Sequence, residues 1–297
     1  MKNRLKGISY AALSSATFGL APFFTVSLLN AGLSPWEVLA YRWGTASAAL
    51  AIFGFMAGLR FRVSGRNLGR IFMLSILRAA TSLSLVIAYS NIATGVASTI
   101  HFMYPLAVAA AMGIFFRERI SPKVIAAIAI SIVGATMLSS GDITAAGGDT
   151  AIGIAAACIS VFSYGGYIVG VRKSGLDDVD SATLTLFVMA FGAAMFLAAG
   201  SLSSGVRFVS DPHLWLYILG IGIFATAVSN MSLVKAIKRI GPTLTSILGA
   251  MEPLTAVVLG IVFFGERFTI VSAIGIALVI AAVTIVVVGT APAQKKD

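Results

Sequence analysis

The chain has 297 residues, of which 58% are hydrophobic and 11% are charged, and it carries a formal net charge of +10. An ordinary soluble domain is about 25% charged, so this composition excludes that class and indicates a membrane protein. The positive charge would also suit a nucleic-acid-binding protein, but basic residues in the loops between membrane spans follow from the positive-inside rule. We therefore expect the lipid bilayer, and no nucleic acid, as a partner.

Apolar runs of about 20 residues, the length of helix that crosses ~30 Å of hydrocarbon, recur along the whole chain. They predict ten membrane-spanning helices joined by short connections, with no soluble domain between them. The predicted spans, in chain order, are 7–29, 35–58, 68–90, 95–116, 121–140, 150–171, 180–204, 211–235, 241–264 and 269–290.

The basic residues predict the orientation of these spans. If the N-terminus is cytoplasmic, 17 of the 21 Lys and Arg fall in cytoplasmic segments. Arg207 and Arg267 remain on the opposite side, and Arg42 and Arg78 fall inside spans. Because cytoplasmic loops are enriched in Lys and Arg, both termini are predicted to be cytoplasmic.

The chain contains an internal repeat. "HFMYPLAVAAAMGIFFRER" and "GAMEPLTAVVLGIVFFGER" share a proline, a Phe–Phe pair and a Glu–Arg pair at a constant spacing of 148 residues. The same shift aligns 88–141 with 236–289 without a gap. These matches predict two five-helix repeats, 1–147 and 148–297.

Five is an odd number, so the second repeat must enter the membrane from the side opposite to the first. Inverted repeats of this kind are typical of secondary transporters. The loop charges agree, because "FFRERISPK" carries three basic residues on the predicted cytoplasmic side, whereas its counterpart "FFGERFTIV" carries one on the far side.

The mid-helix proline followed by "FFRER" or "FFGER", with "MEP" in the second copy, resembles the EamA repeats of the drug/metabolite transporter superfamily. The resemblance covers essentially the whole chain. It implies an all-α integral membrane protein of the bacterial inner membrane, with two inverted five-helix repeats around a central cavity. It also implies a secondary carrier that exports small metabolites by alternating access, and the bacterial aromatic amino-acid exporters of the family favour amino acids, aromatic ones in particular.

Polar side chains inside spans are costly in lipid, so they should face a water-accessible path. Ser75, Arg78, Ser82 and Tyr89 have the spacing of one helix face in the third span. Similar stripes place the cavity wall on spans 1, 3, 4, 6, 8 and 9 and leave the other four spans as outer supports. The predicted substrate-binding residues are Arg78, Ser82, His101, Tyr104, Tyr164, Asn230 and Glu252.

For an amino acid, Arg78 is predicted to hold the carboxylate, Glu252 or Asn230 to face the ammonium group, and Tyr104 and Tyr164 to stack on an aromatic side chain. Structural roles stay open beside these. Arg78 could pair with Glu252 as a fixed ion pair, and Glu252 could satisfy backbone groups freed by the adjacent proline.

His101 is a candidate proton carrier, with a purely hydrogen-bonded role as the alternative. Pro22, Pro105 and Pro253 lie within spans and are the candidate gating positions, although such kinks can also be static. Arg42, next to Trp43, is predicted to be an interfacial anchor. Cys158, which is the single cysteine, is predicted to be a small packing residue.

Enzyme activity is not expected. The sequence contains no HExxH motif and no metal-type His/Cys cluster, and we predict neither a cofactor nor a metal. The lack of a GxxxxGK[ST] loop disfavours direct coupling to ATP. Protons as coupling ion, efflux of drugs or other metabolites, a channel, and a monomer or homo-oligomer all remain open.

Overall fold

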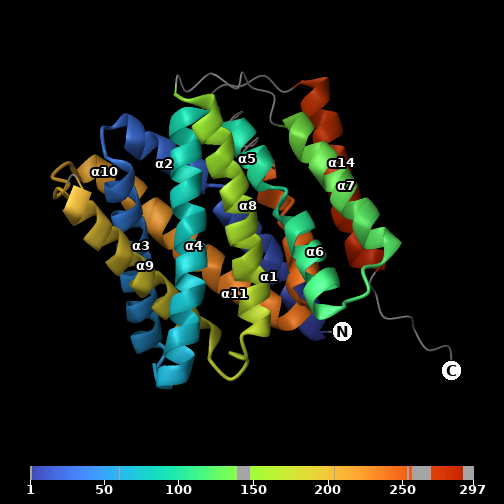
Figure 1. Ribbon diagram of the computed structural model, residues 1–297, viewed down its shortest axis with the longest axis horizontal. Helices are drawn as coiled ribbons and strands as arrows, with labels where there is room; N and C mark the ends of the chain where they lie inside the picture. Colours follow the sequence, from blue (N-terminus) through green and yellow to red (C-terminus); the bar gives the residue numbers. More distant parts are fainter. Residues whose placement is uncertain are drawn as a thin grey trace.

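The computed structural model describes residues 2–59, 61–138, 148–203, 205–252, 254–255 and 269–289, and these ranges contain helices and connections but no β-strand (Figure 1). The predicted all-α membrane fold is confirmed. The helices are α1 Lys2–Phe18, α2 Ala21–Asn30, α3 Pro35–Met56, α4 Gly65–Asn91, α5 Thr94–His101, α6 Tyr104–Phe116, α7 Pro122–Leu138, α8 Thr150–Lys173, α9 Ser181–Ser203, α10 Pro212–Leu219, the π-helix η1 Gly220–Val228, α11 Ser229–Ile240, α12 Pro242–Leu248 and α14 Ile270–Gly289.

Seven helical segments in the described ranges are long and apolar enough to cross a membrane, and each coincides with one predicted span. Two shorter apolar helices, Pro122–Met137 and Ala273–Ile285, correspond to the fifth and tenth predicted spans. The ninth predicted span, 241–264, falls partly outside the described residues, and so does Pro253.

Two of the predicted spans are broken where a proline lies. The first span divides into α1 and α2, with Pro22 in the first turn of α2, and the fourth divides into α5 and α6, with Pro105 in the first turn of α6. Proline is tolerated in a first turn because the amide hydrogen that it lacks has no intrahelical acceptor there. Both prolines therefore start a second helical piece instead of kinking one continuous helix.

The helices pack as pairs. α7 and α14 lie together at one edge of the molecule, α3 and α9 lie together at the opposite edge, and α4 with α8 and α1 with α11 fill the space between them (Figure 1). In each of these contacts a helix of the first repeat packs against a helix of the second. α3 is the counterpart of α9, and α7 is the counterpart of α14, so these two contacts join equivalent helices. α4 corresponds to α11 and α1 corresponds to α8, so the α4–α8 contact is equivalent to the α11–α1 contact.

The first helices of the two repeats run in opposite directions. The start of α1 lies against the end of α11, because a Cβ added to Gly7 would lie 3.0 Å from the Cβ of Arg239. Lys238, also at the end of α11, donates a hydrogen bond to the carbonyl of Leu176, just after α8, at 2.8 Å. The end of α8 therefore lies at the face of the molecule where α1 begins, as an inverted repeat requires.

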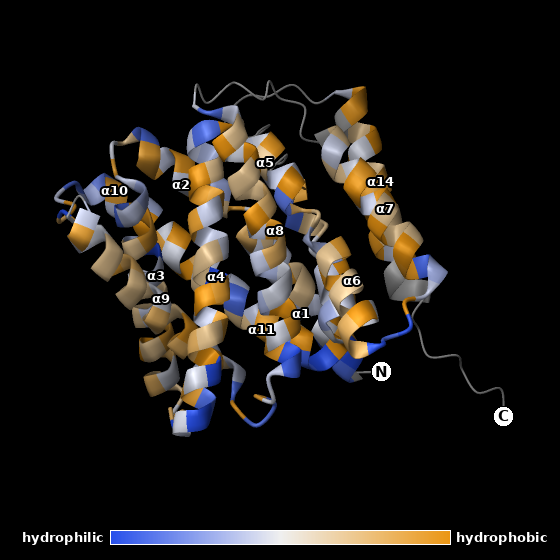
Figure 2. Cartoon of the chain, in the orientation of Figure 1, coloured by the Kyte–Doolittle hydropathy of each residue, from blue (hydrophilic) through white to orange (hydrophobic). Residues whose placement is uncertain are grey.

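Hydrophilic residues collect at the ends of the helices, whereas the flanks between them are mostly apolar (Figure 2). Large apolar side chains on these flanks, such as Ile52, Phe55 and Phe162, are exposed and suit contact with lipid. Cys158 is exposed too, so its predicted role as a packing residue is wrong.

Candidate functional site

Two arginines are buried where the repeats meet. Arg42 on α3 is 3% exposed and Arg78 on α4 is 1% exposed. Both guanidinium groups lie near the ring of Phe18 at the end of α1, at 5.8 Å for Arg42 and 5.2 Å for Arg78, measured from Cζ to the ring centroid. Cations at this distance are attracted to an aromatic face. Phe18 therefore joins the two cations into one cluster.

Arg78 is held by polar groups from both repeats. Its Nε donates to Oδ1 of Asn230 at 2.7 Å, and its Nη1 donates to the hydroxyl of Ser82 at 3.4 Å. Ser82 and Asn230 are equivalent positions in the two repeats, since they are 148 residues apart. Three of the predicted site residues are thus brought together around one guanidinium group.

Aromatic rings surround the same guanidinium group. Its Cζ lies 5.1 Å from the ring centroid of Tyr164 and 6.0 Å from that of Tyr167. The rings of Phe18 and Tyr164 stack with their centroids 6.0 Å apart and an interplanar angle of 15°. Phe18 and Tyr167 were not among the predicted site residues.

Glu252 and Tyr104 form another polar contact between the repeats. The hydroxyl of Tyr104 donates to Oε1 of Glu252 at 3.2 Å. The ring of Tyr104 meets the ring of Tyr164 edge to face, with centroids 4.6 Å apart. Tyr104 thereby connects the carboxylate to the aromatic rings around Arg78.

His101 stacks on Tyr164, with ring centroids 5.2 Å apart, and its Nδ1 lies 2.9 Å from the hydroxyl of Ser160. That hydroxyl donates its only hydrogen to the carbonyl of Ala157 at 2.6 Å, so it accepts from Nδ1. This assigns the proton of a neutral imidazole to Nδ1 and leaves Nε2 as an acceptor. Nε2 is buried and has no partner among the described residues.

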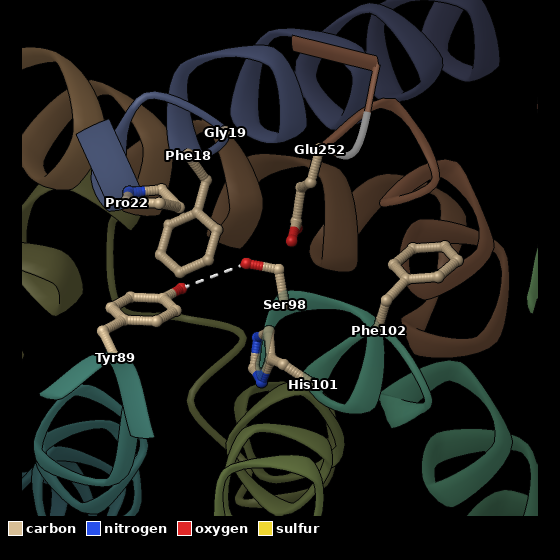
Figure 3. Close-up of a pocket in the computed structure, with 8 residues that line it drawn as sticks. All are labelled: Phe18, Gly19, Pro22, Tyr89, Ser98, His101, Phe102 and Glu252. Carbon is tan, nitrogen blue, oxygen red and sulfur yellow. Dashed lines mark hydrogen bonds between the residues drawn. The ribbon is translucent and has the colours of Figure 1, made fainter. Parts of the chain in front are cut away.

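A cavity of about 30 Å³ lies beside this cluster (Figure 3). A buried water needs roughly 10–15 Å³ of such volume, so the cavity has room for about two water molecules and is too small for an amino acid. Of the predicted substrate-binding residues, Glu252 and His101 line it, and so does Pro22, a predicted gating position. Its lining residues are Phe18, Gly19, Pro22, Tyr89, Ser98, His101, Phe102 and Glu252.

The prediction that Arg42 is an interfacial anchor is wrong. Its Nε donates to the hydroxyl of Thr226 at 2.7 Å, deep in the protein. Arg42 lies seven residues after the start of α3, which places it roughly 10 Å along the helix. That depth is the signal in the sequence that would have identified Arg42 as a buried residue. It also means that α3, which lies at the edge of the molecule, contributes a side chain to the central cluster.

Thr226, the partner of Arg42, lies in the π-helix η1. The hydroxyl of Thr226 donates to the carbonyl of Ile221, five residues earlier, at 2.8 Å, which leaves an oxygen lone pair for Arg42. The amide nitrogen of Asn230 donates to the carbonyl of Thr226 at 2.8 Å. One turn of the chain thus supplies a partner to each arginine, and π-helical turns often occur at functional sites.

Residues 5–140 and 151–288 both match the EamA-like transporter family. A protein of Archaeoglobus fulgidus that is described as an uncharacterized transporter is 26% identical over 239 residues, which are 78% of this chain and 82% of the relative. A second protein of that organism, with the same description, is 24% identical over 280 residues, 93% of this chain and 96% of the relative. A solved crystal structure has the same fold, with a TM-score of 0.78 at 18% identity over 97% of this chain and 96% of the other.

Proposed function

Because this chain belongs to the EamA-like transporter family, and so is a multi-pass membrane transporter of small solutes, we propose that it exports an amino acid, preferably an aromatic one. The carrier would work by alternating access in a bacterial inner membrane, with both termini in the cytoplasm. The observation that carries the proposal is a cluster in which two buried arginines lie close to several aromatic rings and to the partly buried Glu252.

Each part of an aromatic amino acid has a matching group in this cluster. A guanidinium group binds a carboxylate through charge-assisted hydrogen bonds, and the carboxylate of Glu252 suits an ammonium group. The rings of Phe18, Tyr104 and Tyr164 lie between the charges and offer surfaces on which an aromatic side chain can stack. In this proposal the predicted site residues act together as one binding site.

Contacts between the repeats at both faces of the molecule support alternating access. At the face where α1 begins, Arg70 of the first repeat donates to the carbonyl of Gly175 of the second at 3.2 Å. At the other face, Glu37 of the first repeat pairs with Arg207 of the second at 2.9 Å. Because the cavity between them is too small for the substrate, one of these contacts must open for the substrate to enter.

Protons are the coupling ion that we propose. Glu252 and His101 both have ionisable side chains and both line the cavity, and ionisable groups in such positions form the proton relays of transporters. In proteoliposomes with a gradient of pH and no gradient of substrate, the imposed gradient should drive net amino-acid movement. Movement that is the same with and without the gradient would contradict proton coupling while leaving the carrier function intact.

Counterflow tests the carrier proposal itself. Proteoliposomes loaded with unlabelled phenylalanine should take up labelled phenylalanine in a saturable manner, and tryptophan and tyrosine should compete. Protein-free vesicles are the control. Flux that does not saturate would indicate a channel, and counterflow of other metabolites or drugs but of no amino acid would contradict the amino-acid assignment.

A further inference from the structure

The two buried arginines differ in what satisfies them. Arg78 donates from Nε and Nη1 and is surrounded by aromatic rings. Arg42 donates from Nε to Thr226, whereas its Nη2 is buried and has no hydrogen-bond partner among the described residues. A charged donor that is buried without a partner is unfavourable, because it has lost the water that would solvate it.

Among the residues that the structure describes, neither arginine has a carboxylate oxygen within 4.0 Å. Across the described ranges the ion pairs within 4.0 Å are Arg172–Asp177 and Arg207–Glu37, both near the faces of the molecule. The carboxylate of Glu252 is engaged with the hydroxyl of Tyr104 instead. Charged side chains inside a membrane normally pair with each other or with a ligand, so two unpaired arginines leave room for an anionic group.

The position of Arg42 suits a ligand that enters the cavity. Phe18, which lies beneath the guanidinium group of Arg42, also lines the cavity together with Glu252. Anchoring of Nε by Thr226 fixes the plane of the guanidinium group and leaves the Nη2 edge as a donor in a set orientation.

We propose that the Nη2 edge of Arg42 is the position that binds the carboxylate of the substrate. Arg78 is then a positioning residue, which orders Asn230, Ser82 and the rings around the ligand. The inference rests on the proposed function, since it assigns one part of the substrate to one residue. It also makes a carboxylate the group that this position favours, because a carboxylate supplies both the acceptor that Nη2 lacks and a charge opposite to that of Arg42.

Three probes separate the carboxylate from the rest of the substrate. Phenylalanine has both charged groups, 3-phenylpropionate lacks the ammonium group and phenethylamine lacks the carboxylate. Binding of each probe is measured separately on the purified full chain in detergent. The quantity compared is the ligand concentration that produces half of the maximal rise in the midpoint of thermal unfolding. The variants are Arg42→Ala, Arg42→Gln and Arg42→Lys, and the control is Arg66→Ala, which removes an exposed arginine from the first turn of α4.

Arg42→Ala and Arg42→Gln should weaken phenylalanine and 3-phenylpropionate by roughly tenfold or more, since a charge-assisted hydrogen bond is lost. Phenethylamine should bind these variants as it binds the unmodified protein, and Arg42→Lys should restore part of the loss. Arg66→Ala should bind all three probes without change.

Two results would overturn the assignment of Arg42. One is unchanged binding of all three probes by the folded Arg42→Ala or Arg42→Gln protein, and the other is an equal loss for all three, which would indicate a structural role. Arg42→Lys keeps the charge and supplies the test if the smaller variants do not fold. If the unmodified protein binds 3-phenylpropionate but not phenylalanine, the amino-acid function fails while the carboxylate position stands.

Discussion

Tyr104 and Glu252 occupy the same position in the two repeats, 148 residues apart, and they are joined by a hydrogen bond of 3.2 Å. Equivalent residues of two repeats can touch only near the axis that relates the repeats. Phe18 and Tyr164, at equivalent positions near the ends of "GISYAALSSATFG" and "GIAAACISVFSYG", stack on each other in the same way. The candidate site is therefore on this axis, and neither repeat contains it alone.

Tyr104→Phe should weaken substrate binding and leave the fold intact. The change removes only the hydroxyl that donates to Glu252, which frees the carboxylate to move within the cavity. One hydrogen bond of this kind corresponds to about 0.5–1.5 kcal/mol, or roughly two- to tenfold in affinity. The half-saturation concentration of phenylalanine counterflow measures the effect, and Tyr217→Phe on α10 is the matched control. Equal values for Tyr104→Phe and Tyr217→Phe would contradict a role for this contact.

Gly249→Ala should disrupt the same contact through packing. A Cβ at Gly249 would collide with the hydroxyl of Tyr104 and would lie 2.8 Å from the carbonyl of Ser246. Gly44→Ala is the control, because nothing lies within 4 Å of its Cβ and alanine favours helix by about 1 kcal/mol. We expect Gly249→Ala to lower the thermal midpoint and the transport rate, and Gly44→Ala to lower neither. A fully active Gly249→Ala protein would show that transport does not require Tyr104 in the position that donates to Glu252.

His101→Gln should retain more transport than His101→Leu. His101 lines the cavity, and its Nε2 is a buried acceptor without a partner among the described residues. A glutamine side chain can supply an acceptor oxygen whereas leucine cannot. The rates of phenylalanine counterflow, at equal amounts of folded protein in the vesicles, compare the two variants. If leucine serves as well as glutamine, the histidine has only a packing role.

Glu37→Gln should favour opening of the face that carries Arg207. Glu37 is 3% exposed and accepts from both the backbone and the side chain of Arg207, and the pKa of the Arg207 guanidinium is raised by this hydrogen bond and charge. The arginine therefore stays charged throughout the physiological range of pH. Loss of the negative charge should loosen this contact between the repeats.

The opening of that face can be measured by chemical labelling. A protein with Cys158→Ser and Val209→Cys carries one thiol, at a position that is 9% exposed next to Arg207. Addition of Glu37→Gln should speed the reaction of this thiol with a membrane-impermeant maleimide. Arg172→Gln, which breaks the Arg172–Asp177 pair, is the control and should leave the rate unchanged. A labelling rate that Glu37→Gln does not change would show that the Glu37–Arg207 ion pair does not hold this face closed.

The helices and their order could be predicted because apolar runs of span length and an internal repeat are properties of the sequence alone. The grouping of Arg78, Ser82 and Asn230 was also accessible, since helical spacing and the repeat place them on related faces. Phe18 gave no comparable signal, because an aromatic side chain is as compatible with lipid as with a binding site.

Arg42 was misassigned for two physical reasons. Its neighbour Trp43 is of a type that is enriched at membrane interfaces, which favoured the anchor interpretation. Its partner Thr226 lies in a π-helix, whose register departs from the 3.6-residue period on which helical patterns are based. The depth of Arg42 in α3 would have been the better guide.

Equilibrium binding of labelled phenylalanine to the purified protein tests the central claim most directly, with Arg78→Ala and Arg66→Ala measured beside the unmodified chain. The account predicts saturable binding that Arg66→Ala retains and that Arg78→Ala loses, because Arg78, unlike the exposed Arg66, contacts the side chains of the cluster on the repeat axis. Binding that a folded Arg78→Ala protein retains at full affinity would contradict the claim that the substrate binds in this cluster.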